Sequence, residues 1–165
     1  MQSFTVRPSI PALRAARTAL IQRTWRQAYA HLFPASLMDD LFGGRVEQVS
    51  AWSDARRELL TGRSAFDSAE TLIGMVGLAL LDTGGGEVVA LYVEPAWHGR
   101  GVGRALWQAG AAVLREHGAA WVDVWTLARA DAVGFYEKLG CVRFADDVYR
   151  IGDHHEPAVG LRMPL

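Results

Sequence analysis

The stretch that best indicates the fold of this chain is residues 91–106, with the sequence LYVEPAWHGRGVGRAL. The apolar residues up to Val93 are typical of a strand, a proline ends that strand, and a periodic apolar pattern begins a helix after the glycines. The first amides of a helix lack internal partners and lie at the positive end of its dipole. Gly99, Gly101 and Gly103 carry no Cβ atoms that would keep an anion from those amides. The stretch therefore predicts a turn that binds a diphosphate.

The two common nucleotide-binding patterns do not fit these glycines. The P-loop pattern G-x-x-x-x-G-K-S/T needs a lysine and a hydroxyl residue, and neither follows here. The dinucleotide fingerprint G-x-G-x-x-G needs a third glycine, but Arg104 or Leu106 stands in that place. The predicted ligand is thus a diphosphate of another class, with Arg100 and Arg104 adding positive charge beside it.

Outward from this stretch, hydrophobic patterning predicts alternating strands and helices. The expected strands are residues 4–7, 71–81, 88–93, 121–126, 142–144 and 159–163, and the expected helices are residues 11–32, a short one capped by Ser36, 46–60, 100–117 and 132–139. The triple glycine at 84–86 turns one strand back on the next as a hairpin, and Asp131 is expected to cap the last helix. We expect an α/β (α+β) fold in which residues 1–165 form a single domain.

The composition narrows the class of protein. The chain has 165 residues, of which 50% are hydrophobic, and its 17 Lys and Arg nearly balance 18 Asp and Glu. A general nucleic-acid binder would carry a basic excess, and the apolar stretch 72–81 is far shorter than the roughly 20 residues that cross a bilayer. The single cysteine, Cys141, excludes an internal disulfide and fits a reducing compartment. We therefore expect no nucleic-acid or membrane partner and a cytoplasmic location.

Two motifs resemble the GNAT superfamily of acyl-CoA-dependent N-acyltransferases. Residues 98–103, HGRGVG, follow its cofactor signature Q/R-x-x-G-x-G/A, except that His98 replaces Gln or Arg. Residues 132–140, AVGFYEKLG, resemble the family's A-x-x-F-Y-x-K-x-G element, although Arg129 stands where an upstream Asn is customary. Residues 25–37 also look like the first-helix region of many bacterial members. The resemblance covers nearly the whole chain, and the order of the expected elements agrees with it.

The resemblance implies a mixed, mostly antiparallel sheet of six to seven strands with splayed central parallel strands and four to five helices. It implies acetyl-CoA as co-substrate, no metal, and direct acetyl transfer to a primary amine of a small molecule or peptide. The pantetheine arm is expected to pair with the backbone of residues 88–93, and the amides of residues 99–104 to hold the pyrophosphate. The implied cofactor-binding residues are Leu91, Tyr92, Val93, His98, Gly99, Arg100, Gly101, Val102, Gly103 and Arg104. A catalytically idle acyl-CoA sensor is the alternative, and a homodimer through the C-terminal strands stays open.

The resemblance also implies two catalytic candidates. Tyr136 is the candidate general acid, because a phenol with a pKa of about 10 stays protonated at neutral pH and can supply a proton to a leaving thiolate. Packing beside Phe135 is the alternative interpretation of Tyr136. Glu87 is the candidate general base, because an ammonium must lose a proton before its nitrogen attacks. A solvated carboxylate after three glycines fits Glu87 equally well.

The remaining aromatic and polar residues have less specific signals. Trp25, Tyr29 and Trp52 either line an acceptor pocket or pack in the core. The run from Asp153 to Glu156 contains His154 and His155 but lacks the spacing of metal ligands, so a solvated loop is expected there.

Overall fold

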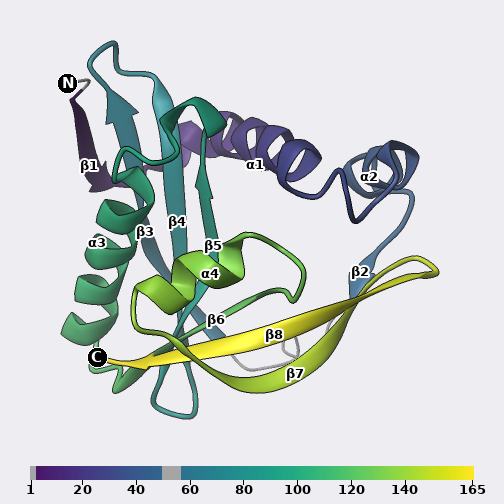
Figure 1. Cartoon of the computed structure of the whole chain (residues 1–165). Coiled ribbons are helices and arrows are strands. Elements are labelled where there is room, and N and C mark those ends of the chain that lie inside the picture. Colours follow the sequence, from purple (N-terminus) through teal and green to yellow (C-terminus); the bar gives the residue numbers. More distant parts are fainter. Residues whose placement is uncertain (1–2, 50–56) are drawn as a thin grey trace.

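The structure, a computed structural model, describes residues 3–49 and 57–165 (Figure 1). The strands are β1 (Phe4–Pro8), β2 (Gln48–Val49), β3 (Arg57–Asp67), β4 (Leu72–Leu81), β5 (Gly86–Val93), β6 (Trp121–Leu127), β7 (Val142–Ile151) and β8 (His154–Pro164). The helices are α1 (Arg14–Ala28), α2 (Ala35–Phe42), α3 (Val102–Glu116) and α4 (Ala132–Lys138), with short 3-10 turns η1 (Pro11–Leu13) and η3 (Pro95–Trp97). The strands form one sheet in the order β1-β3-β4-β5-β6-β8-β7-β2. This confirms the predicted mixed, mostly antiparallel α/β fold, to which β2 adds an eighth, two-residue strand.

The central parallel pair of strands is very short. β5 pairs with β6 only over Gly86–Val88, opposite Val122–Val124. β5 continues to Val93 and β6 to Leu127, but in the part of the chain that the structure describes no ladder joins these ends. The two strands therefore diverge and leave an open notch. Because strand amides and carbonyls need partners, the notch edge of β5 can pair with an extended ligand in the way that an added strand would.

β5 also carries a bulge at the point where the notch opens. In the ladder with β4, Gly77 lies opposite Ala90 and Leu78 lies opposite Val88, so Val89 is the extra residue. A bulge bends its strand and interrupts the strict alternation of side chains between the two faces. The bulge thus allows neighbouring side chains of β5 to face the same side of the sheet.

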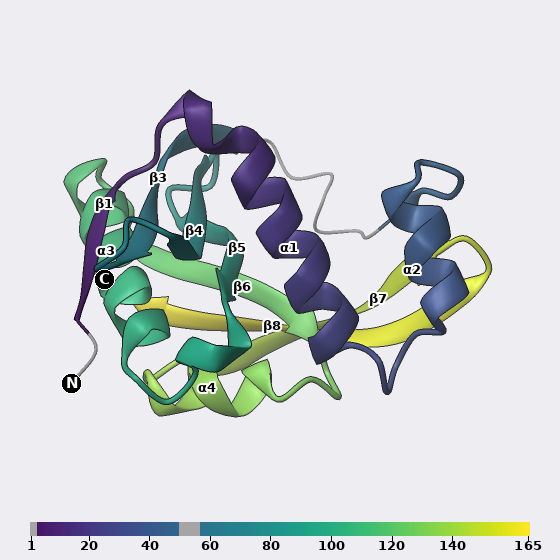
Figure 2. The ribbon, with the colours of Figure 1, turned by 90° about the horizontal axis from the view of Figure 1, so that it is seen from above.

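Apolar residues cover both faces of the sheet. One cluster packs α3 against the strands and includes the fully buried Val76, Leu106 and Leu114. Figure 2 shows α1 on the other side of the central strands from α3 and α4. A second cluster joins α1 and α2 to β7 and β8, with Trp25 and Ile151 among its buried members. No helix among the described residues is long and apolar enough to cross a membrane.

The predicted helix over residues 46–60 is wrong at both of its described ends. Gln48–Val49 pairs with β7, and the long strand β3 begins at Arg57; the segment 50–56, with Trp52, lies outside the described residues. Gly62 does not stop a helix but lies within β3, where the register with β4 shifts. A Cβ atom on Gly62 would overlap the carbonyl of Val76. Glycine suits both a helix end and a strand bulge, and only the tertiary contact distinguishes them.

Two smaller predictions are also wrong. Ser36 does not cap α2, because the helix begins at Ala35 after Pro34 and has no side-chain cap. The polar segment expected as a loop at residues 153–156 is mostly strand, since β7 extends to Ile151 and β8 already begins at His154. Asp131 does precede α4 at the N-cap position, but its side chain makes no capping hydrogen bond.

We predict that Gly62→Ala destabilises the fold. The added methyl group would meet a backbone carbonyl that cannot move without disturbing the β3–β4 ladder, so unfolding in urea should report a loss of about 1–3 kcal/mol. The matched control is Gly134→Ala in α4, where a Cβ atom has no neighbour within 4 Å. That control should be neutral or stabilising by up to about 1 kcal/mol. Equal stability of the two variants would contradict the role assigned to Gly62.

Candidate functional site

The turn between β5 and α3 owes its conformation to two glycines. Gly99 and Gly101 have φ angles of +72° and +85°, a region that residues with a Cβ atom rarely adopt. A Cβ atom on either glycine would point into open space. The third glycine, Gly103, is favoured for a different reason. A Cβ atom on it would lie 3.3 Å from the Phe135 ring of α4. The sequence thus placed the turn correctly, while the structure assigns Gly103 to helix packing.

The turn directs the N-terminus of α3 toward this open space. Gly101 is the N-cap and provides no side chain to bind the first amides. The first intrahelical bond is donated by the Ala105 amide to the Gly101 carbonyl, at 2.9 Å, so the amides of residues 102–104 precede it. Arg100 lies over the Trp97 ring, with its guanidinium carbon 5.3 Å from the ring centre. Helix N-terminal amides and a nearby cation make a suitable cradle for phosphate oxygens.

His98 connects the turn to the end of β5. Its Nε2 atom lies 2.9 Å from the Val93 carbonyl oxygen and donates a hydrogen bond to it. The side chain that replaces the family's Gln or Arg therefore holds the last residue of β5 in place. Val93 itself is 9% exposed and packs with Leu91 on the α3 side of the sheet, which leaves their backbone groups at the edge of the notch.

Arg104 lies beside a basic groove between α3 and α4. The groove has a volume of about 340 Å³, and three of its lining residues are cations, Arg104, Arg115 and Lys138. None of its described lining residues is acidic; the others are Trp107, Gln108, Ala111, Leu139 and Met163. The groove begins one residue beyond the glycine turn, so positive charge extends from the N-terminus of α3 along the helix.

The four tyrosines of the chain lie close enough together for their charges to interact. Tyr29 is the C-cap residue of α1, and Tyr92, Tyr136 and Tyr149 lie in β5, α4 and β7. Burial is the main cause that raises the pKa of each phenol, and unfavourable charge interactions with Tyr29 or Tyr92 raise the pKa of Tyr136 and Tyr149 further. These phenols consequently stay protonated over the whole physiological range, and each can donate a hydrogen bond or a proton.

Tyr136 is both packed and close to this group of hydroxyls. Its ring lies 5.5 Å from Trp107 and 5.2 Å from Phe135, and the residue is only 5% exposed. The packing interpretation of Tyr136 is therefore correct for its ring. Its hydroxyl nevertheless lies near enough to Tyr29 and Tyr92 for their charges to affect its pKa.

Glu87 lies at the closed end of the notch. The residue is 4% exposed, so it is not the solvated turn carboxylate that its position after three glycines also allowed. In the β5–β6 ladder it stands opposite Asp123, whose carboxylate accepts bonds of 2.7 and 2.8 Å from Arg162. Because a Cβ atom on the preceding Gly86 would meet Leu114 of α3, the Glu87 side chain faces away from α3.

A cavity of about 610 Å³ opens on the side of β5 that faces α1 and α2. Its described lining residues are Ile21, Trp25, Leu41, Phe42, Val46, Glu47, Val89, Ala90 and Tyr92. Trp25 therefore lines a cavity, which agrees with the first of the two interpretations that the sequence allowed, a pocket-lining residue or a core residue. Tyr29 does not line it but packs edge-on against Trp25, with ring centres 4.8 Å apart.

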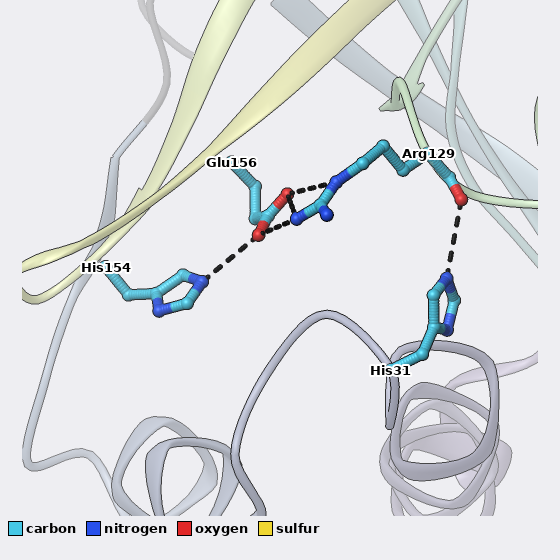
Figure 3. Close-up of polar contacts among 4 residues, drawn as sticks. All are labelled: His31, Arg129, His154 and Glu156. Carbon is cyan, nitrogen blue, oxygen red and sulfur yellow. Dashed lines mark hydrogen bonds and ion pairs between the residues drawn. The ribbon is translucent and has the colours of Figure 1, made fainter.

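The sequence did not predict an ion pair between the exposed Arg129 side chain and the buried Glu156 carboxylate, which joins the loop before α4 to β8. Figure 3 shows Glu156 of β8 between Arg129 and His154. Arg129 Nη2 lies 2.5 Å from one Glu156 oxygen and 2.6 Å from the other, and His154 Nε2 lies 3.2 Å from the carboxylate. Glu156 is 3% exposed. The alternation of His154 and Glu156 along one face of a strand was the available signal for this pair, and it was missed because this segment was expected to be a loop.

The same loop is held from its other side by the turn that follows α1. The Arg129 carbonyl lies 3.4 Å from His31 Nε2 (Figure 3). Arg129, which stands where the family has Asn, thus contacts β8 through its side chain and the turn after α1 through its backbone. In the described ranges 3–49 and 57–165, no group of three or more His, Cys, Asp or Glu side chains is arranged to hold a metal ion.

Comparison with known proteins agrees with this fold. The family model for GNAT acetyltransferases matches residues 19–141. The chain therefore belongs to the GNAT acetyltransferase family.

Among curated proteins, a mycothiol acetyltransferase of Saccharopolyspora erythraea is 35% identical over 111 residues, which are 67% of this chain and 34% of that protein. The chain thus spans about a third of the length of such relatives. An uncharacterized N-acetyltransferase of Bacillus subtilis, YuaI, is 26% identical over 145 residues, or 86% of this chain and 82% of that protein.

Solved structures share the fold at low sequence identity. The PaiA N-acetyltransferase of Thermoplasma acidophilum, solved in complex with coenzyme A, has a TM-score of 0.73 at 13% identity, with 99% of each chain covered. Nourseothricin acetyltransferase has a TM-score of 0.64 at 18% identity, with 98% of each chain covered.

We predict that Glu156→Gln lowers the thermal midpoint by several degrees at pH 7, because the buried Glu156 side chain loses the negative charge that pairs with Arg129. Hydrogen bonds from Arg129 are the main cause that lowers the pKa of Glu156 below its ordinary value of 4.5. A lowered folded-state pKa stabilises the fold above the unfolded-state pKa, and that contribution disappears as the pH falls through the folded-state value. The difference between wild type and variant should therefore shrink on acidification below about pH 4.5.

The control for this measurement is Glu70→Gln. Glu70 pairs with Arg7, but its side chain is 68% exposed, so its removal should change the midpoint little at any pH. A Glu156→Gln difference that stays constant from pH 7 to pH 3 would rule out a stabilising role for the carboxylate charge.

Proposed function

We propose that this chain is an acetyl-CoA-dependent N-acetyltransferase that transfers the acetyl group directly to a primary amine. The observation that carries the proposal is the notch between β5 and β6, together with the glycine turn at its open end. An extended arm that pairs with the edge of β5 would place a diphosphate at the N-terminus of α3. Acetyl-CoA supplies the acetyl group as a thioester and combines such an arm with such a diphosphate.

The residues of the turn fit the polar part of this co-substrate. The space beside Gly99 and Gly101 that a Cβ atom would enter is open, and the amides of residues 102–104 lie next to it. The backbone of Leu91, Tyr92 and Val93 would pair with the amide groups of the arm, and His98 keeps the Val93 end of that edge fixed. Arg104 and the basic groove beyond it carry the charge that further phosphate groups require.

Tyr136 is our candidate for the general acid. As the nitrogen attacks the thioester carbonyl and the carbon–sulfur bond breaks, the leaving sulfur needs a proton. The Tyr136 hydroxyl carries a proton at physiological pH, because burial raises its pKa. Cys141, whose own pKa is raised by burial to about 11, is a neutral neighbour of this hydroxyl.

Glu87 is our candidate for the general base. It faces the same side of the sheet as the cavity and lies two residues before the bulge at Val89. A carboxylate there can accept the proton of the substrate ammonium, directly or through a water, so that the nitrogen lone pair can attack. Its neighbour Asp123 is already paired with Arg162, so Glu87 is our candidate of the two carboxylates.

The proposal is tested by mixing the protein with acetyl-CoA and a panel of primary amines while thiol release is followed. We expect release that depends on both the protein and an amine. Tight binding of CoA without turnover on any amine would instead indicate an acyl-CoA sensor, and stabilisation by NAD or ATP rather than by CoA would contradict the assignment of the turn.

We predict that Gly101→Val weakens CoA binding at least tenfold, because its side chain would occupy the space assigned to the diphosphate. The matched control is Gly118→Val at the other end of α3. Gly118 has a φ of +84°, compared with +85° for Gly101, and both have open surroundings. Both variants carry the same backbone strain, so calorimetric titration with CoA isolates the effect on the ligand. Equal affinity in the two variants would remove the turn from the binding site.

We predict that Tyr136→Phe lowers kcat by roughly 10²-fold or more and leaves the affinity for CoA nearly unchanged, because the phenyl ring keeps the packing and loses only the proton donor. Tyr29→Phe and Tyr92→Phe are the comparison variants, since their hydroxyls belong to the same group. If kcat stayed unchanged in Tyr136→Phe and fell in Tyr92→Phe instead, the general acid would be Tyr92 of β5 and not Tyr136.

A further inference from the structure

Most of the side chains that line the cavity beside α1 and α2 are apolar. Among its described lining residues, only Glu47 is charged, and the polar atoms of Trp25 and Tyr92 are bonded to each other. Trp25 Nε1 donates to the Tyr92 hydroxyl over 2.8 Å. These residues therefore present ring faces and aliphatic carbons to an occupant, with few hydrogen-bond partners.

The aromatic wall of this cavity is held in place from several sides. The Trp25 ring is stacked 6.3 Å from Phe33, and Phe42 and Tyr149 pack against it at 6.1 and 6.0 Å. A side chain restrained by three rings and a hydrogen bond loses little freedom when a ligand binds against it. The wall is thus a preformed surface for a flat, apolar group.

The cavity leads to the point where the chemistry is placed. Val89 and Ala90 line it, and they directly follow Val88, the last residue at which β5 pairs with β6. Its volume of about 610 Å³ lies within the range of roughly 300–1,000 Å³ that small-molecule sites occupy. An occupant that fills it would therefore reach the opening of the notch with one end.

We propose that the acceptor is a primary amine carried by an apolar body of aromatic size and lacking a carboxylate next to the nitrogen. This inference rests on the proposed function and adds the class of acceptor. Glu47, exposed at the rim, favours a cation and disfavours a carboxylate. A polyamine or an aminoglycoside would place several nitrogen or hydroxyl groups against side chains that offer few partners, and each buried polar group without a partner costs roughly tenfold in affinity.

The test compares kcat/KM for 2-phenylethylamine, spermidine, kanamycin and phenylalanine at saturating acetyl-CoA. We expect 2-phenylethylamine to exceed each of the others at least tenfold. A polyamine, an aminoglycoside or the free amino acid that equals it would overturn the inference while confirming the transferase.

A lack of turnover on every amine would instead count against the proposed function. The acceptor class is then decided by calorimetric titration of the CoA-loaded protein with the same four amines. Selective binding of 2-phenylethylamine supports the inference even in a protein that does not turn over, and its absence contradicts it.

Two variant pairs locate the effect in the cavity. Val89→Trp should lower kcat/KM for 2-phenylethylamine at least tenfold but affect ethylamine much less, because only the larger body competes with the added ring. Val142→Trp is its control, since Val142 is 70% exposed on β7 and does not line the cavity.

Glu47→Gln should raise KM for the amine several-fold with kcat unchanged, whereas Glu116→Gln at the exposed end of α3 should change neither. Equal behaviour of each variant and its control would overturn the inference.

Discussion

The divergence of β5 and β6 after three paired residues is the constraint on which the rest of this structure depends. A parallel pair in the middle of a sheet normally continues, because each unpaired amide or carbonyl is costly to bury. Here the bulge at Val89 bends β5 away from its neighbour, and the carbonyl of its last residue accepts a bond from His98. Helices lie on both sides of the central strands (Figure 2), and beyond Val88 no described ladder joins β5 to β6.

The two faces of the sheet offer opposite chemistry to this notch. On the side of α3 and α4, the helix N-terminus and the groove of Arg104, Arg115 and Lys138 are positive. On the side of α1 and α2, most of the side chains that line the cavity are apolar, and the one charged residue among the described lining residues is Glu47. A polyanionic co-substrate and a cationic acceptor would therefore approach from different sides and meet at the notch, which suits a transfer within a ternary complex.

The departures from the family motifs have structural replacements in this chain. His98 uses its ring nitrogen to hold the end of β5, and Arg129 uses its guanidinium to bind the buried Glu156. Both bonds fix segments that lead into the site, namely the turn before α3 and the loop before α4. These substitutions are thus compatible with an ordered site, and they do not by themselves favour an inactive relative.

The sequence by itself determined the features that depend on near neighbours. The glycine turn, the start of α3 and the hairpin of β4 and β5 follow from residues a few positions apart, because positive φ angles and helix periodicity are local properties. The assignment of β3, the burial of Glu156 and the bulge at Val89 were decided only by strands that pair across the sheet. The same holds for the gathering of the four tyrosines and for the wall of the cavity, where Trp25 and Tyr92 meet although they are 67 residues apart. A local pattern cannot encode such contacts, because which side chains meet depends on the register and the bend of strands that the pattern does not contain.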